Sequence, residues 1–317
     1  MSANLSYIKK AEGQLSDIVS GGGYLLREQV DKFVEIQILE SKLLAMADVQ
    51  QMEAQEVEVD KLGFTGQVLH PAEENTQLGS DERSQAEYGK TVLSTKPFKA
   101  EAVMSFRMVR NAINRGQFIP TVISLLSKAA RRDVERVIIR GDTSLPATTP
   151  MSRLLRKMNG VLKQATSHVY DAAGAALSQN VMDEMGIAMP TEYYESDQLV
   201  YLSSKNACIR YRRSIANRPT VLGDTQYKSR TNTDHAGTPV ISVPLFPEDL
   251  TYNSVSAYTS SLLLDPKNIM VGFQTDMEVF QEVQARAGQF VVVMYFDFDV
   301  VFRHEPAVVK AINISAR

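Results

Sequence analysis

The chain has 317 residues, of which 44% are hydrophobic and 22% are charged, and its formal net charge is −3. This composition predicts a globular protein with a buried core, built as one large domain or two, and the weak negative charge excludes a strongly basic protein that wraps nucleic acid. The single cysteine, Cys208, excludes an internal disulfide. No apolar run approaches the roughly 20 residues that a membrane-spanning helix needs, so we expect no membrane contact and no secretion.

The N-terminal region is predicted to form an arm followed by a helix. A glycine triplet at 21–23 costs too much backbone entropy to be helical, which makes residues 1–20 a separately mobile arm. Residues 24–48 then place apolar side chains at helical spacing with acidic residues between them, which indicates an amphipathic helix.

Residues 68–97 form a long polar and charged segment between two short β-like pieces at 64–69 and 91–94. This pattern predicts an extended hairpin with little core of its own. Loops of this length are uncommon in folded proteins unless they are disordered or functional, so we expect this one to lie on the surface of a partner.

The longest predicted helix covers Phe118–Arg140, with Pro120 in its first turn and Gly141 ending it. Its apolar side chains form one stripe. The basic side chains lie on the other faces and are interpreted as a solvated surface; they are Lys128, Arg131, Arg132, Arg136 and Arg140.

The middle of the chain mixes short helices and strands, which favours an α+β fold. Helices are predicted at 175–185 and 204–213, a buried strand at 198–202, and a proline-bounded strand at 239–244, placed at a sheet edge or a strand end.

The C-terminal region predicts a long strand with a turn before it at Ala287-Gly288. From Phe296 to Phe302 apolar and polar side chains alternate, so Phe296, Phe298, Val300 and Phe302 share one face. Such a face requires a cover, and the helix Phe118–Arg140 is the expected one.

This order of parts resembles the major capsid proteins of tailed double-stranded DNA bacteriophages, whose type example is the phage Hong Kong ninety-seven. The resemblance rests on degenerate motifs in the family's order, spread over nearly the whole chain. They are Gly141-Asp142 after the long helix, Asn159-Gly160, the strand and helix of 199–213, Gly237-Thr238-Pro239-Val240, and the closing pattern of 265–272, 290–302 and Glu305-Pro306-Ala307-Val308.

The resemblance implies an α+β capsid fold with four parts: an N-terminal arm with a helix (1–60), an extended loop (61–98), a peripheral domain with the spine helix and a long hairpin (99–175 and 276–317), and an axial domain (176–275). It also implies self-assembly into pentamers and hexamers of an icosahedral shell that encloses the phage genome. The expected partners are other copies of the chain, a separate scaffolding protein, a portal, a decoration protein and packaged double-stranded DNA in weak contact. The expected location is the virion, after assembly in the host bacterial cytoplasm.

Two groups of residues are candidate contact sites. The extended loop carries charged residues that are expected to set the register between subunits: Glu82, Arg83, Glu87 and Lys90. A basic cluster could contact DNA or an acidic neighbour, or could form local ion pairs, which is the more frequent outcome for such a cluster. Its members are Lys205, Arg210, Arg212, Arg213 and Arg218.

Enzymatic and metal sites are not expected. Residues 84–91 nearly match a phosphate-binding loop, but Ser84 stands where the first glycine belongs. Asp297 and Asp299 could share a cation but lack a third ligand, and the histidines at 70, 168, 235 and 304 lack metal-binding spacing. No cofactor is predicted, and Cys208 is interpreted as a small buried thiol.

One member of the family that this chain resembles cross-links its subunits through lysine and asparagine side chains. Lys90 and Lys96 offer amines here, but residues 269–312 contain no asparagine, so this chemistry is not expected. Two alternatives stay open: a nanocompartment shell of the encapsulin type, which encloses a protein cargo, and an unrecognised α+β enzyme.

Overall fold

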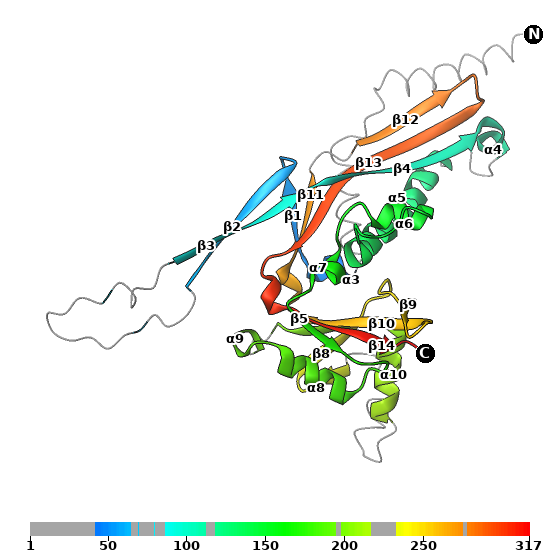
Figure 1. The fold of residues 1–317 in the computed structure, drawn as a ribbon. Coiled ribbons are helices and arrows are strands. Elements are labelled where there is room, and N and C mark those ends of the chain that lie inside the picture. Colours follow the sequence, from blue (N-terminus) through cyan, green and yellow to red (C-terminus); the bar gives the residue numbers. More distant parts are fainter. Residues whose placement is uncertain are drawn as a thin grey trace, which may run out of the picture.

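A computed structural model describes residues 42–64, 69, 79, 86–111, 118–194, 198–216, 233–274 and 278–317. The fold is α+β, as predicted, and contains a five-stranded sheet, a seven-stranded sheet and a two-stranded ribbon. Figure 1 shows the two sheets one above the other, with the ribbon projecting sideways from the upper one. The arm 1–20 and the predicted helix up to residue 41 lie outside the described residues.

The five-stranded sheet is organised around one long strand. That strand, β13, pairs antiparallel with β4, β11 and β12, and β1 adds to β11 in parallel. The strands are β1 (Asp48–Met52), β4 (Lys96–Ser105), β11 (Ile269–Gln274), β12 (Glu278–Gln284) and β13 (Gln289–Phe302). The predicted turn at Ala287-Gly288 joins β12 to β13, and Gly288 has a φ of 66°, a left-handed conformation that favours glycine.

Helix α5 (Phe118–Arg140) covers one face of this sheet and has the predicted bounds. Its buried Val134, Val137 and Ile138 belong to the same core cluster as Phe298 and Val300 of β13. The prediction that this helix covers the alternating strand is therefore confirmed. The shorter helices on this half of the molecule are α3 (Lys42–Met46), α4 (Phe106–Asn111), α6 (Pro150–Leu155) and α7 (Val161–Gln164).

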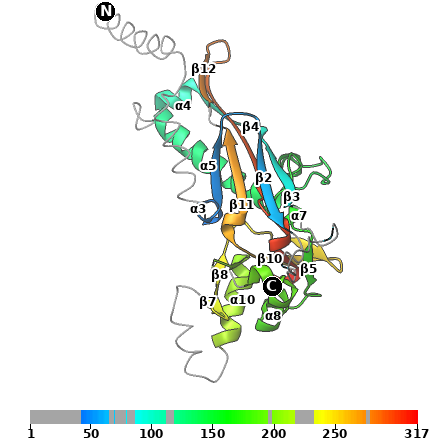
Figure 2. The same cartoon turned by 90° about the vertical axis from the view of Figure 1, so that its left-hand side faces the viewer.

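The seven-stranded sheet has the order β5-β14-β10-β6-β8-β7, and β9 pairs with β10. Its strands are β5 (His168–Asp171), β6 (Val200–Ser203), β7 (Thr233–His235), β8 (Thr238–Ser242), β9 (Leu250–Tyr252), β10 (Val255–Leu264) and β14 (Val309–Ser315). Figure 2 shows α8 (Gln179–Ala188) and α10 (Lys205–Ala216) at the lower end of the molecule, below this sheet. The remaining elements are α9 (Thr191–Tyr194) and the short helices η1 (Pro266–Asn268) and η2 (Glu305–Ala307).

Several predicted boundaries differ from the structure. The helix expected at 175–185 begins later, at Gln179, because Ala176 pairs with Ser315 in an isolated β-bridge and Ser178 has the extended backbone of an N-cap. The proline-bounded strand β8 was expected at an edge or a strand end, but it lies between β6 and β7, and only the three-residue β7 forms the edge. The first strand of the extended hairpin ends at Phe64, where the sequence interpretation had it begin.

The sheets divide the chain differently from the predicted domains, among other places at β5, β11 and β14. β5 and β14 fall within 99–175 and 276–317, yet both pair in the seven-stranded sheet. β11 falls within 176–275, yet it pairs with β1 and β13 in the five-stranded sheet. These pairings join segments far apart in the chain, and local periodicity carries no information on them.

Candidate assembly surfaces

The extended hairpin of the sequence prediction is a two-stranded antiparallel ribbon. It is formed by β2 (Glu56–Phe64) and β3 (Ala86–Ser94), which pair from Glu56 opposite Ser94 to Phe64 opposite Ala86. Its base is anchored by Leu93, which is fully buried in a small cluster with Met52 and Met270. Beyond this base the ribbon projects away from the body of the molecule (Figure 1).

One face of the ribbon is exposed and partly apolar. Leu62, Tyr88 and Val92 are 74%, 59% and 45% exposed, and the strand pairing places all three on the same face. An isolated two-stranded ribbon is marginally stable in water, and exposed apolar side chains grouped on one surface are typical of interaction sites. This face is therefore a candidate contact with another molecule.

Carboxylates line the same exposed face. Glu58 pairs with the ammonium group of Lys90, Asp60 accepts a hydrogen bond from the hydroxyl of Tyr88, and Glu56 accepts one from the hydroxyl of Ser94 at 3.1 Å. The hydrogen bond to Asp60 raises the pKa of Tyr88, and the hydrogen bond to Glu58 raises the pKa of Lys90. Such exposed pairs contribute little to stability, so a partner can rearrange them at small cost.

The predicted contact residues of the loop are only partly within the described chain. Glu82 and Arg83 lie outside the described residues. Glu87 lies in β3 opposite Gly63, where only its backbone is described. Lys90 lies on the exposed face and pairs with Glu58 of its own chain, and its role between subunits stays a prediction. The sequence interpretation missed β2, although the alternation of Glu56, Val57, Glu58 and Val59 is a period-two signal.

The four members of the predicted basic cluster that lie in α10 differ in exposure and in partners. Lys205 and Arg213 are exposed. Arg210 donates to the hydroxyl of Ser315 at 2.9 Å, and Arg212 donates to the hydroxyl of Thr233 at 3.2 Å. These contacts hold Arg210 and Arg212 against their own chain through neutral hydroxyl groups, so both the local ion pairs and the contact with DNA or an acidic neighbour stay predictions. Arg218 lies outside the described residues.

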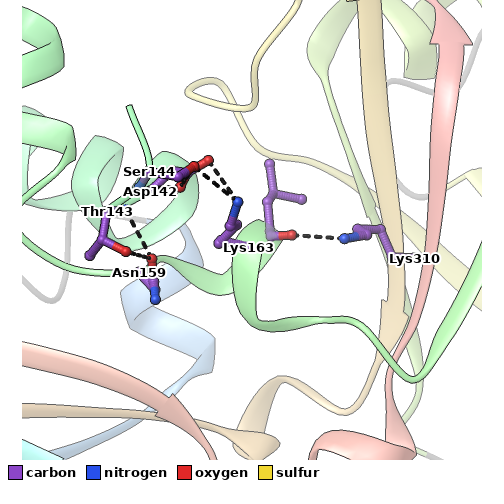
Figure 3. Close-up of polar contacts among 7 residues, drawn as sticks. Asp142, Thr143, Ser144, Asn159, Lys163 and Lys310 are labelled. Atoms are coloured by element: carbon purple, nitrogen blue, oxygen red, sulfur yellow. Dashed lines mark hydrogen bonds and ion pairs between the residues drawn. The ribbon is translucent and has the colours of Figure 1, made fainter. Parts of the chain in front are cut away.

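A polar cluster at the end of α5 joins the two halves of the molecule (Figure 3). Lys163 donates to Asp142 at 3.1 Å and to the hydroxyl of Ser144 at 3.2 Å. Lys310 of β14 donates to the backbone carbonyl of Leu162 in α7 at 3.0 Å, and its burial, together with the nearby Lys163, lowers its pKa. The cluster thus links the spine helix, through α7, to the seven-stranded sheet.

A second set of hydrogen bonds in this cluster holds the loop that follows α5, at Thr143. The side-chain oxygen of Asn159 accepts hydrogen bonds from both the backbone N–H and the hydroxyl of Thr143, each at 3.0 Å (Figure 3). Gln164, at the end of α7, donates to the carbonyl of Val300 in β13 at 2.7 Å. Segment 159–164 therefore contacts α5, β13 and β14 together, which makes it the structural junction of the fold.

The described residues carry little that resembles catalytic chemistry. Within these ranges no group of three His, Cys, Asp or Glu side chains could hold a metal ion. Asp299 accepts a hydrogen bond from the backbone N–H of Ser94 at 2.9 Å, and burial raises its pKa. Cys208 is buried, and this burial raises the pKa of its thiol to about 11. None of the helices in the described part of the chain has the length and apolar character needed to cross a membrane.

We compared the sequence and the fold with those of known proteins. No family model matches the chain. A curated relative from Bacillus subtilis (strain 168), "Putative prophage capsid protein YqbE", is 28% identical over 98% of this chain and 99% of its own length. Among solved structures, the satellite phage P4 procapsid including size determination (Sid) protein matches with a TM-score of 0.67 at 13% identity, over 99% of this chain and 98% of that one. The chain has the Hong Kong ninety-seven type capsid fold.

This capsid fold confirms the resemblance stated from the sequence. The fold also occurs outside phages, because the SrpI encapsulin complex of Synechococcus elongatus PCC 7942 matches with a TM-score of 0.60 at 12% identity, over 88% of this chain and 89% of that one. In this capsid fold the ribbon β2–β3 takes the place of the predicted extended loop and α5 that of the spine helix. The Gly141-Asp142 and Asn159-Gly160 motifs meet at the junction.

Proposed function

We infer that this chain is the major capsid protein of a tailed phage or prophage, the subunit of the icosahedral shell around the genome. The observation that carries this function is the end-to-end match to a prophage capsid protein, over 98% of this chain and 99% of the relative. The role is structural, and we propose that the chain has no catalytic activity.

The ribbon gives this function a physical mechanism. It exposes the apolar side chains of Leu62, Tyr88 and Val92, and a neighbouring copy would bury them on assembly. A contact between a projecting ribbon and a different surface of the next copy is heterologous, and such contacts close into rings when the rotation permits. Pentamers and hexamers of the shell are the rings that we propose.

We assign one domain of the capsid fold to each of the two sheets. We propose that the five-stranded sheet with α5 forms the peripheral domain, the seven-stranded sheet forms the axial domain, and the ribbon forms the extended loop. The predicted boundaries at 99–175, 176–275 and 276–317 are then shifted at β5, β11 and β14, which pair across them.

The other partners remain proposals from the family resemblance. A separate scaffolding protein would guide assembly in the host bacterial cytoplasm, a portal would occupy one vertex, and a decoration protein would bind the finished virion. The packaged double-stranded DNA would contact the shell weakly, in keeping with the net charge of −3.

An encapsulin-type shell is the second candidate, because the SrpI encapsulin complex shares the fold over 88% of this chain. The two functions differ in what the shell encloses. Nuclease-protected DNA inside the particle supports the phage capsid, whereas an enclosed protein cargo supports the nanocompartment.

Negative-stain electron microscopy of the purified chain, alone and with a candidate scaffolding protein, tests the shell. Closed particles, or rings of five and six subunits, are the expected result. A stable monomer under every condition would contradict the proposed function.

A further inference from the structure

Asn159 is followed directly by Gly160, and this order of residues is the most favourable one for spontaneous deamidation. In this reaction the backbone nitrogen of the following residue attacks the carbonyl carbon of the asparagine side chain. A glycine hinders the attack least, because it has no Cβ atom and its backbone adopts the widest range of conformations. Asn159 is also exposed, so solvent reaches its side chain. Sequence and access therefore make Asn159 a candidate modification site.

The reaction needs no reagent other than water. Gly160 gives up its amide proton to a solvent base, its nitrogen forms a bond to Cγ of Asn159, and the bond from Cγ to the side-chain nitrogen breaks as ammonia leaves. The product is a succinimide ring. Water then adds to one of the two ring carbonyls and opens the ring to aspartate or to isoaspartate. In isoaspartate the main chain runs through Cβ and Cγ, so it is longer by one carbon atom.

In the folded chain both reacting groups are held in other contacts. The N–H of Gly160 donates to the carbonyl oxygen of Gly141 at 2.9 Å, so the nitrogen cannot lose this proton while the contact persists. The side-chain oxygen of Asn159 accepts from the backbone N–H and from the hydroxyl of Thr143, each at 3.0 Å (Figure 3). These hydrogen bonds anchor the side chain of Asn159 to the loop after α5.

Crowding around Gly160 adds to the effect of the hydrogen bonds. A Cβ atom at Gly141 would lie 2.8 Å from the nitrogen of Gly160, and a Cβ atom at Gly160 would lie 2.5 Å from the carbonyl oxygen of Ile138. Closing a succinimide ring moves the atoms on both sides of this nitrogen, and closely packed backbone leaves no room for that movement. The reaction therefore requires the junction to open.

We propose that Asn159 is a deamidation site controlled by folding. The unfolded chain reacts at Asn159-Gly160, and formation of the contact between Gly160 and Gly141 stops the reaction. The site depends on the fold of one subunit and not on assembly of the shell.

The two products differ in whether they fit the junction. Aspartate at position 159 leaves the main chain unchanged and keeps an oxygen that accepts from Thr143. Isoaspartate lengthens the main chain next to Gly160, at the point where its N–H meets Gly141. Extra atoms in a closely packed region displace the backbone. Unfolded chains are therefore expected to accumulate a form that cannot build the junction, whereas folded chains stay intact.

Asn253-Ser254 provides a control within the same chain. The two residues are exposed and form the turn between β9 and β10, with φ values of 47° and 65°. The strand pairing joins Tyr252 to Val255 and leaves the two turn residues out of the ladder. Serine hinders the attack more than glycine does, so Asn253 should react more slowly than Asn159 in the unfolded chain. Folding should slow Asn159 far more than Asn253.

The test measures deamidation of the full chain, folded in buffer and unfolded in guanidinium chloride, at the same mildly alkaline pH. Trypsin releases residues 158–163 as one peptide, because cleavage follows Lys157 and Lys163. Mass spectrometry measures the mass increase, and an isoaspartyl methyltransferase assay measures isoaspartate. The digestion is brief and mildly acidic, so that it adds no deamidation. The rate at Asn159 should be at least about tenfold lower in the folded chain, because reaction requires local opening.

Each outcome bears on one part of the proposal. Equal rates at Asn159 in the folded and the unfolded chain would overturn the protection. The absence of reaction at Asn159 in guanidinium chloride would overturn the site itself. An equal slowing of Asn159 and Asn253 on folding would overturn the role of the junction contacts.

Variants of Thr143 isolate one of the hydrogen bonds. Thr143→Val removes the hydroxyl donor and should raise the rate at Asn159 in the folded chain by about two- to tenfold, the effect of losing one hydrogen bond. Thr143→Ser keeps the hydroxyl and is the matched control. Neither variant should change the rate in guanidinium chloride, and circular dichroism establishes that each is folded. Equal rates in the two folded variants would overturn the role of the Thr143 hydroxyl.

Refolding tests the fate of the products. Chains aged in guanidinium chloride are diluted into buffer, and size-exclusion chromatography separates the folded fraction from aggregates. Isoaspartate at position 159 should be depleted in the folded fraction, whereas the variant Asn159→Asp should refold like the parent chain. An equal isoaspartate content in both fractions would overturn its exclusion from the junction.

Discussion

Gly160 donates its backbone N–H to the carbonyl oxygen of Gly141 at 2.9 Å, which brings two distant turns into backbone contact. A Cβ atom at Gly160 would lie 2.5 Å from the carbonyl oxygen of Ile138, and one at Gly141 would lie 2.6 Å from that of Met158. Neither position has room for a side chain. The end of the spine helix is therefore fixed against segment 159–164, which also contacts both sheets.

We expect Gly160→Ala to destabilise the folded subunit by about 1–3 kcal/mol, because the added methyl group must displace backbone atoms. The measurement is the urea unfolding midpoint of the soluble subunit. Gly89→Ala in the ribbon is the matched control, since its nearest contact would be at 3.7 Å. Equal effects of the two substitutions would contradict the close approach at the junction.

Truncation of the spine helix core should have a large effect. Ile138 lies on α5 and is fully buried in the core. Ile138→Ala should therefore lower the free energy of unfolding by about 2–5 kcal/mol. The control on the opposite face is Leu125→Ala, which should change it by less than about 0.5 kcal/mol in the isolated subunit. Thermal or urea unfolding compares the two, and a similar loss in both would contradict the assigned burial.

Glu305 should contribute a pH-dependent part of the stability. Burial opposes its ionisation, but hydrogen bonds from the hydroxyl of Ser167 and from the backbone N–H groups of Thr166 and Ser167, at 2.7 Å and 2.8 Å, lower its pKa overall. A lowered pKa in the folded state means that the stabilisation is present above the pKa of the unfolded chain and is lost as the pH falls through the folded value.

The measurement for Glu305 is the unfolding free energy between about pH 6 and pH 3. Glu305→Gln should be less stable than the parent chain near pH 6, and the difference should shrink as the pH falls through the lowered pKa of the folded carboxylate, because the parent side chain then becomes protonated. Curves that stay parallel over this range would rule out the contribution of Glu305.

Cys208 should be unreactive in the folded subunit. Its burial raises the thiol pKa to about 11, so little thiolate exists near pH 8 and reagent has poor access. A thiol-specific reagent should modify it only after denaturant is added. Lys205→Cys combined with Cys208→Ala is the positive control, since position 205 is exposed. Rapid modification of native Cys208 would show that α10 opens.

The elements that the sequence predicted well are those whose pattern is local. Helix α5 repeats apolar residues at helical spacing and ends at Gly141, so its bounds were predicted. The alternating face of β13 and the turn at Ala287-Gly288 follow from the same local rules. Strand β4 was missed because Lys96, Pro97 and Lys99 mask its alternation at the start.

The candidate site was predicted in outline only. The polar loop between two β-like pieces indicated a hairpin that needs a partner, but the position of β2 and the exposed row of Glu56, Glu58 and Asp60 emerged from the strand register. The basic cluster at Lys205 to Arg218 was read from sequence proximity alone. The environment of the cluster depends instead on contacts with distant parts of the chain. Arg210 donates a hydrogen bond to Ser315, and Arg212 donates one to Thr233.

By itself the sequence determined the fold class, the spine helix, the projecting hairpin and the family resemblance, because periodicity, glycine positions and the order of parts are encoded in neighbouring residues. Only the tertiary structure decided that β1 pairs with β11 and β5 with β14, that Gly141 meets Gly160, and that α5 and the base of the ribbon pack on opposite faces of β13. These features depend on which distant segments bury their surfaces together, and the packing of the whole chain selects that.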